Sequence, residues 1–204
     1  MIDLVIGSFT LSIVHALIPN HWIPIITISK AENWKLSEAM KVTGITAIAH
    51  SFGTVLLGIA LGALGVELAD RFELFTHLIA PLILLIIGLV YLSISDRHHH
   101  HHLPKSIKNK SKSAIIAALS LSMFLSPCLE MESYFLFAGR ESWLAVWVVA
   151  LVFLVTTILS MILLVYIGYN GIERIKWDLL EKHEKKISGL LLIAIGAYAL
   201  LFSH

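Results

Sequence analysis

The sequence predicts an all-α integral membrane protein, and three observations carry that prediction: composition, block length and the placement of charge. The chain has 204 residues, of which 57% are hydrophobic and 14% charged, and its mean hydropathy is +0.84. The apolar residues form long blocks instead of the spaced stripes of soluble amphipathic helices. Only short polar segments remain between the blocks, so we expect no soluble domain.

Six apolar blocks are candidate transmembrane helices, at about 20 residues per crossing. They cover residues 3–27, 40–64, 74–95, 114–138, 143–169 and 188–203. The first block follows MIDLV, which carries no basic segment, and it is too long for a typical signal-peptide core. We therefore expect it to be retained as a helix.

The basic residues predict the topology. Thirteen of the 15 Lys and Arg residues lie in or flank the connections between the first and second, third and fourth, or fifth and sixth spans, and only Arg71 and Arg140 lie elsewhere. Basic residues concentrate in cytoplasmic loops. We therefore expect both termini to face outward, in a bacterial or archaeal cell membrane. The chain shows no basic patch of the kind that binds nucleic acid.

An internal repeat relates the two halves. A shift of 108 residues aligns LSIVHALIP at 11–19 with LSLSMFLSP at 119–127, and places Gly88 on Gly196. The alignment predicts two three-helix repeats, residues 1–95 and 114–204, joined by a linker at 96–113. Three crossings are an odd number, so the repeats are expected to be inverted. Transporters built in this way bind substrate near the midplane, where corresponding helices are interrupted.

Prolines interrupt the first and fourth predicted spans at corresponding positions, Pro19 and Pro127. A proline inside a helix removes one backbone hydrogen bond and crowds the carbonyl four residues earlier. Those carbonyls belong to His15 and Met123. We expect them to be free, and to be candidate contributors to a cation site.

Histidines lie inside the apolar spans, where polar groups are costly and usually mark a site. His15 and His50 are expected near the membrane centre and His21 nearer the cytoplasm. In a straight helix His15 and His21 would point about 120° apart, so we expect unwinding at Pro19 to turn both toward His50. Three imidazoles suit Ni²⁺, Co²⁺, Zn²⁺ or Cu²⁺ better than Mg²⁺ or Ca²⁺. Asn20 is a further candidate; each histidine alone could instead hydrogen-bond a neighbouring helix.

The matching segment of the second half, SPCLEMESYF, carries a thiol and two carboxylates after its proline. Glu130 is expected to be the deeper carboxylate and a metal ligand or proton carrier. Glu132, nearer the outer surface, is a further candidate. Cys128 is either a soft ligand or a small buried apolar residue. It is the only cysteine, which excludes an intramolecular disulfide.

The linker carries a run of five histidines, for which we keep two interpretations, a metal-collecting loop at the cytoplasmic face and a polar spacer. The run consists of His98, His99, His100, His101 and His102.

These motifs together resemble the nickel/cobalt transporter family called NicO, within the lysine-exporter-like superfamily. The resemblance rests on HALIPNH, on AIAHS in the next span, on the His-rich linker and on the SPC segment that opens the second half. It implies metal recognition by His15, His21 and His50.

The chain departs from the NicO pattern at two positions. Asn20 stands where one branch of the family has aspartate, and Ile18 stands where an efflux branch has an acidic residue. We expect Glu130 or Glu132 to supply the missing negative charge from the other half.

The leading hypothesis is therefore a secondary transporter of a divalent transition metal, such as nickel, cobalt or zinc, moved outward in exchange for protons. Its expected partners are the bilayer, the metal ion and protons, and a homo-oligomer is compatible with the sequence. An alternative is an intramembrane hydrolase in which the three histidines hold Zn²⁺ and Glu130 is the general base, although inverted repeats argue against it. A membrane electron carrier would need a second cysteine, and a membrane subunit of a larger assembly has no partner signature here.

Overall fold

The computed structural model describes residues 1–17, 19–71, 74–93, 111–126, 128–171 and 178–202. Every regular element within these ranges is a helix, which confirms the predicted all-α class. In chain order the helices are α1 (Ile2–Leu17), α2 (Pro19–Ala31), α3 (Leu36–Arg71), the π-helix η1 (Phe75–Ile79), α4 (Ala80–Ser93), α5 (Lys112–Phe124), α6 (Leu129–Gly139), α7 (Trp143–Gly171) and α8 (Asp178–Phe202).

Three stretches of the described chain are long and apolar enough to cross a membrane: Ile2–Ala31, Leu36–Arg71 and Trp143–Gly171. Shorter apolar helical segments cover His77–Val90 and Gly189–Leu201, and α5 is of the same kind. Large apolar side chains cover much of the surface, as expected for helices that face lipid. The structure therefore confirms a helical protein with helices that, by length and composition, could span a membrane.

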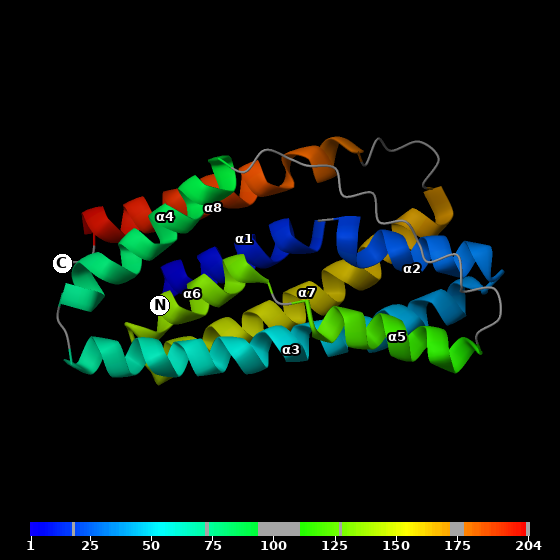
Figure 1. Ribbon diagram of the computed structural model, residues 1–204, viewed down its shortest axis with the longest axis horizontal. Coiled ribbons are helices and arrows are strands. Elements are labelled where there is room, and N and C mark those ends of the chain that lie inside the picture. The colour runs from blue at the N-terminus through cyan, green and yellow to red at the C-terminus, as the bar shows by residue number, and fades with distance from the viewer. Residues whose placement is uncertain (18, 72–73, 94–110, 127, 172–177, 203–204) are drawn as a thin grey trace.

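The long helices α3 and α7 lie side by side, as Figure 1 shows, and they support the shorter broken helices. Helix α7 also contacts α1 and α2, while α3 also contacts α5 and α6. Helices α4 and α8 form a separate pair along the opposite side of α1 (Figure 1). The two interrupted segments, α1–α2 and α5–α6, therefore lie against the α3–α7 pair.

The α5–α6 segment breaks near the middle of its length. Helix α5 ends at Phe124 and α6 begins at Leu129, with Cys128 at its N-cap. In the α1–α2 segment the described part of α1 reaches Leu17 and that of α2 starts at Pro19, and residue 18 between them is outside the description. Pro127 is also outside the described residues.

Glycines on α3 allow close approach to the second half of the chain. A Cβ at Gly65 would overlap the carbonyl oxygen of Leu136 in α6, and a Cβ at Gly53 would overlap the carbonyl oxygen of Phe124 at the end of α5. Small residues at membrane helix interfaces let backbones pack closely in this way. Gly53 lies three residues after His50, so the close packing brings that histidine to the break between α5 and α6.

Candidate metal centre

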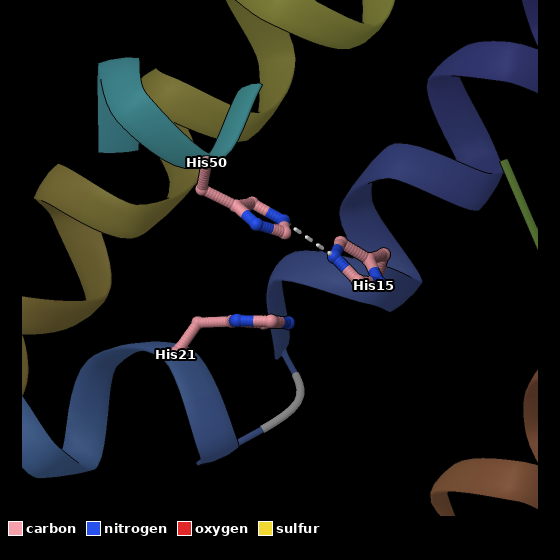
Figure 2. Close-up of side chains that lie close together, drawn as sticks. All are labelled: His15, His21 and His50. Carbon is pink, nitrogen blue, oxygen red and sulfur yellow. Dashed lines mark hydrogen bonds between the residues drawn. The ribbon is translucent and has the colours of Figure 1, made fainter. Parts of the chain in front are cut away.

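Three histidines meet where α1, α2 and α3 approach one another. His15 lies in the last turn of α1, His21 in the first turn of α2 and His50 within α3. The ring centroids are 4.6 Å apart for His15 and His21, 4.5 Å for His21 and His50, and 5.4 Å for His15 and His50. One nitrogen from each ring lies within 4.8 Å of the other two, and Figure 2 shows the rings converging. We call these residues the three-histidine group.

A change of direction between α1 and α2 brings two of these histidines together. His15 and His21 are separated by six residues, which in one straight helix would place them on different faces. Their ring centroids are nevertheless 4.6 Å apart, so α1 and α2 do not continue as one straight helix. Both rings then face α3, where His50 lies.

All three imidazoles are buried. The exposed fractions are 5% for His15, 8% for His21 and 0% for His50. Buried polar groups are costly unless they are paired or bind a ligand. Each of these rings is therefore expected to have a polar partner or to bind a ligand.

The hydrogen bonds of His50 determine where its proton lies. Its Nδ1 is 3.1 Å from the carbonyl oxygen of Met123, and a carbonyl can only accept, so Nδ1–H is the donor. In a neutral imidazole the other nitrogen then carries the lone pair. The Nε2 atom of His50 is 3.1 Å from Nε2 of His15, so the His15 Nε2–H donates to it (Figure 2). His15 is left with its lone pair on Nδ1.

The Met123 carbonyl differs in role from the sequence-based expectation. It accepts the hydrogen bond from His50 and lies 3.3 Å from the backbone nitrogen of Ser126. The break in the helix does release this carbonyl from ordinary helical pairing. Its observed partner, however, is a histidine, which it orients.

A second group of donors lies on the other side of His15. Cys128 Sγ is 3.1 Å from His15 Nδ1 and 3.2 Å from Glu130 Oε2. Cys128 is 2% exposed and Glu130 is 6% exposed. The nitrogen, sulfur and oxygen donors all lie within 4.8 Å of one another. We call His15, Cys128 and Glu130 the mixed-donor group.

The remaining predicted site residues are placed as follows. Glu132 is buried, at 4% exposure, and neither of its carboxylate oxygens has a hydrogen-bond partner among the described residues. It belongs to neither donor group. The backbone of Asn20 lies in α2, and its side chain is outside the description, as is the whole run His98–His102.

Sequence reasoning named Cys128 as a candidate but did not foresee its contact with His15. The two residues are 113 positions apart. The shift of 108 residues could have indicated this contact, because it aligns the start of α6, where Cys128 lies, with the start of α2, which lies between His15 and His21. No local pattern indicated that His50 would bind the Met123 carbonyl.

A cavity of about 610 Å³ lies away from this centre, at the N-terminal end of α1. Its polar lining includes Asp3, His77, Tyr134, Arg140 and Glu141. None of the histidines of the three-histidine group lines it, so it is a separate feature at the N-terminal end of α1.

Comparison of the chain with protein-family models, with curated proteins and with solved structures finds no match. The functional argument therefore rests on the residues and their geometry.

Proposed function

We propose that the protein is a secondary transporter of a divalent transition-metal ion of the nickel, cobalt or zinc kind. The observation that carries the proposal is the burial of three imidazoles around one point, which the hydrogen bond from His50 to the Met123 carbonyl places next to the α5–α6 break. Substrate sites of many membrane transporters lie at such interruptions. The resemblance of HALIPNH and AIAHS to NicO motifs supports the same function.

The chemistry of the donors supports a transition metal. Imidazole nitrogens bind Zn²⁺ at about 2.0–2.1 Å, so two such ligands lie at most about 4.2 Å apart. The nitrogens of the three-histidine group lie within 4.8 Å of one another, which requires only a small contraction around an ion. Neutral imidazoles bring no charge, and Glu130, whose Oε2 lies 3.2 Å from the Cys128 sulfur beside His15, offers an acidic oxygen from the second half of the chain.

We further propose that the fold is six spans arranged as two inverted repeats, and the helix bounds support this. A shift of 108 residues carries α1 to positions 110–125, where α5 covers Lys112–Phe124. It carries α2 to positions 127–139, where α6 covers Leu129–Gly139. It carries α3 to positions 144–179, most of which belong to α7. Each broken segment of the first half therefore has a broken counterpart.

The contacts between α4 and α8 provide independent support. A Cβ at Gly88 would meet the carbonyl oxygen of Gly189, and a Cβ at Gly196 would meet the carbonyl oxygen of Pro81. The shift of 108 residues aligns Pro81 with Gly189 and Gly88 with Gly196. The contact between Gly88 and Gly189 is therefore the counterpart of the contact between Gly196 and Pro81. Pro81, earlier in α4, meets Gly196, late in α8, while Gly88, later in α4, meets Gly189, so the two helices are antiparallel. A two-fold axis perpendicular to the helices, the symmetry of inverted repeats, would produce this pair of counterpart contacts, and the contacts support the proposal in that way.

Coupling to protons follows from the ligands. Metal ions bind neutral imidazole, so protons and metal compete for the same nitrogen atoms. An ion released on the side of lower pH leaves protonated histidines behind, which can return and release protons on the other side. We therefore propose outward metal transport in exchange for protons, with the histidine run of the linker at the cytoplasmic face.

Ion flux into proteoliposomes tests the proposal. Ni²⁺, Co²⁺, Zn²⁺ and Mn²⁺ are supplied in turn, with and without a pH gradient. We expect flux of Ni²⁺, Co²⁺ and Zn²⁺, and we expect it to be faster when the proton gradient drives protons in the direction opposite to the metal. We expect little flux of Mn²⁺, which prefers oxygen ligands. His15→Ala should abolish the flux, while His77→Ala, an exposed histidine far from the group, should not.

Two results would contradict the transporter. Equal flux in the wild type and in His15→Ala would show that the three-histidine group is not the substrate site. Metal that stays bound in one equivalent through purification, with no flux of any ion, would favour the zinc-dependent hydrolase instead.

A further inference from the structure

We infer that His15 serves two adjoining ion positions in turn, and that the second is formed with Cys128 and Glu130, so that the substrate is an ion that accepts a thiolate ligand. This inference rests on the proposed transport function and specifies its path and its substrate class. The observation behind it is that the two ring nitrogens of His15 face different donor groups.

The two groups share this one residue. On one side, His15 Nε2 is 3.1 Å from His50 Nε2, within the three-histidine group. On the other, His15 Nδ1 is 3.1 Å from Cys128 Sγ, within the mixed-donor group. A neutral imidazole offers a lone pair on only one nitrogen at a time. His15 can therefore complete one group or the other, and not both at once.

The hydrogen bonds identify which group His15 completes before an ion arrives. The Met123 carbonyl holds the proton of His50 on Nδ1, and His50 in turn holds the proton of His15 on Nε2. The lone pair of His15 consequently points at Cys128. The mixed-donor group has its nitrogen ready, whereas the three-histidine group gains the nitrogen of His15 only after that ring changes tautomer.

The positions belong to different halves of the chain. The three-histidine group is built on the α1–α2 break and on α3, while Cys128 and Glu130 open α6 after the α5–α6 break. An ion that moves from one group to the other crosses from the first half to the second while it keeps His15 as a ligand. In a transporter of two repeats, such a shared ligand lets the ion cross this boundary without losing all its partners at once.

The mixed-donor group also defines the class of ion. Metal ions bind cysteine as the thiolate, so the thiol proton leaves as the ion enters. Thiolate and imidazole favour Zn²⁺, Co²⁺ and Ni²⁺ over Mg²⁺, Ca²⁺ and Mn²⁺, which prefer oxygen. Thiolate and carboxylate together offset the two positive charges of the ion, which matters because both residues are almost fully buried.

Cobalt absorption tests the second position in the purified full-length protein. Thiolate ligation of Co²⁺ produces a charge-transfer band in the near ultraviolet, and Cys128 is the only cysteine, so the band reports on this position and not on the histidine run. We expect the band in the wild type and its loss in Cys128→Ser, with Co²⁺ still bound by histidines. Met131→Leu, which removes a buried sulfur from the next turn of α6, should keep the band.

Two further variants separate the positions. The double variant His21→Ala, His50→Ala should keep the charge-transfer band, because His15 Nδ1, Cys128 and Glu130 remain. Glu130→Gln should keep the band while lowering Co²⁺ affinity about tenfold, as expected for loss of one ligand. If Cys128→Ser fails to fold, as judged by circular dichroism and gel filtration, the Co²⁺ affinity of Glu130→Gln still tests the second position.

The outcomes distinguish this inference from the transport function on which it rests. Co²⁺ bound by the wild type without a charge-transfer band would overturn the second position and leave the three-histidine group standing. A band that disappears in the His21→Ala, His50→Ala variant would also overturn it, because the two groups would then form one position. A wild-type protein that binds no Co²⁺ would overturn both.

Discussion

Replacement of His50 by alanine is the sharpest test of the metal centre, because the side chain has two separable roles. It is fully buried, it donates to the Met123 carbonyl at 3.1 Å, and it accepts from His15 at 3.1 Å. The same ring is one of three nitrogen donors around the candidate ion position. Loss of packing and loss of metal binding therefore need to be measured apart.

The expected loss of stability in His50→Ala follows from the contacts. Hydrogen bonds between membrane helices contribute about 0.6 kcal/mol each on average, so two account for about 1.2 kcal/mol. The cavity left by a buried ring adds about 2 kcal/mol or more. The Met123 carbonyl keeps its backbone partner at Ser126, so no carbonyl is left unpaired. We expect a protein that is less stable but still folded.

The expected effect on metal is distinct in kind. Removal of one of three nitrogen ligands should weaken Ni²⁺ or Co²⁺ binding about tenfold or more and abolish flux. His50→Gln provides the separation, because its amide can donate to the Met123 carbonyl and accept from His15 but is a poor ligand for these ions. We expect Gln to restore much of the stability and none of the transport.

The assay compares three variants with the wild type by thermal unfolding in detergent, metal binding by dialysis, and proteoliposome flux. Thr46→Val is the matched control, since Thr46 is fully buried one turn earlier in α3 and its hydroxyl bonds only its own helix. Its flux should equal that of the wild type. Unchanged flux in His50→Ala would refute the reasoning and reduce His50 to a packing residue.

Three other predictions follow from the same structure. Gly196→Leu should destabilise the protein or change its folding yield by separating α4 from α8, as measured by thermal unfolding, whereas Gly44→Leu, which meets nothing within 4 Å, should have little effect; equal losses would contradict the close packing. Glu130→Gln combined with Glu132→Gln should reduce metal binding and transport by removing two buried carboxyl groups, and unchanged values would show that these groups are not needed. His100→Cys, in a variant without the native cysteine, should react with membrane-impermeant thiol reagents only after cells are opened; labelling of intact cells would reverse the topology.

Part of the site was predictable from local chemistry. Histidines six residues apart around Pro19 come together only if the helix changes direction between them, and the rings of His15 and His21 do meet. Histidines inside apolar blocks must be buried, paired or functional, and His15, His21 and His50 are buried together. These inferences needed only the periodicity of a helix and the cost of polar groups in an apolar environment.

The sequence by itself determined the helical, apolar class of the protein, because composition and block length leave no other way to satisfy the backbone in a membrane. Only the tertiary structure decided that His15 meets Cys128 across 113 positions, that Glu132 is buried, and that the Met123 carbonyl orients His50. These contacts depend on how closely α3 approaches α5 and α6, which is set by glycines such as Gly53 and Gly65 against facing carbonyls. Such approach is a property of two surfaces fitted together, and neither segment shows it alone.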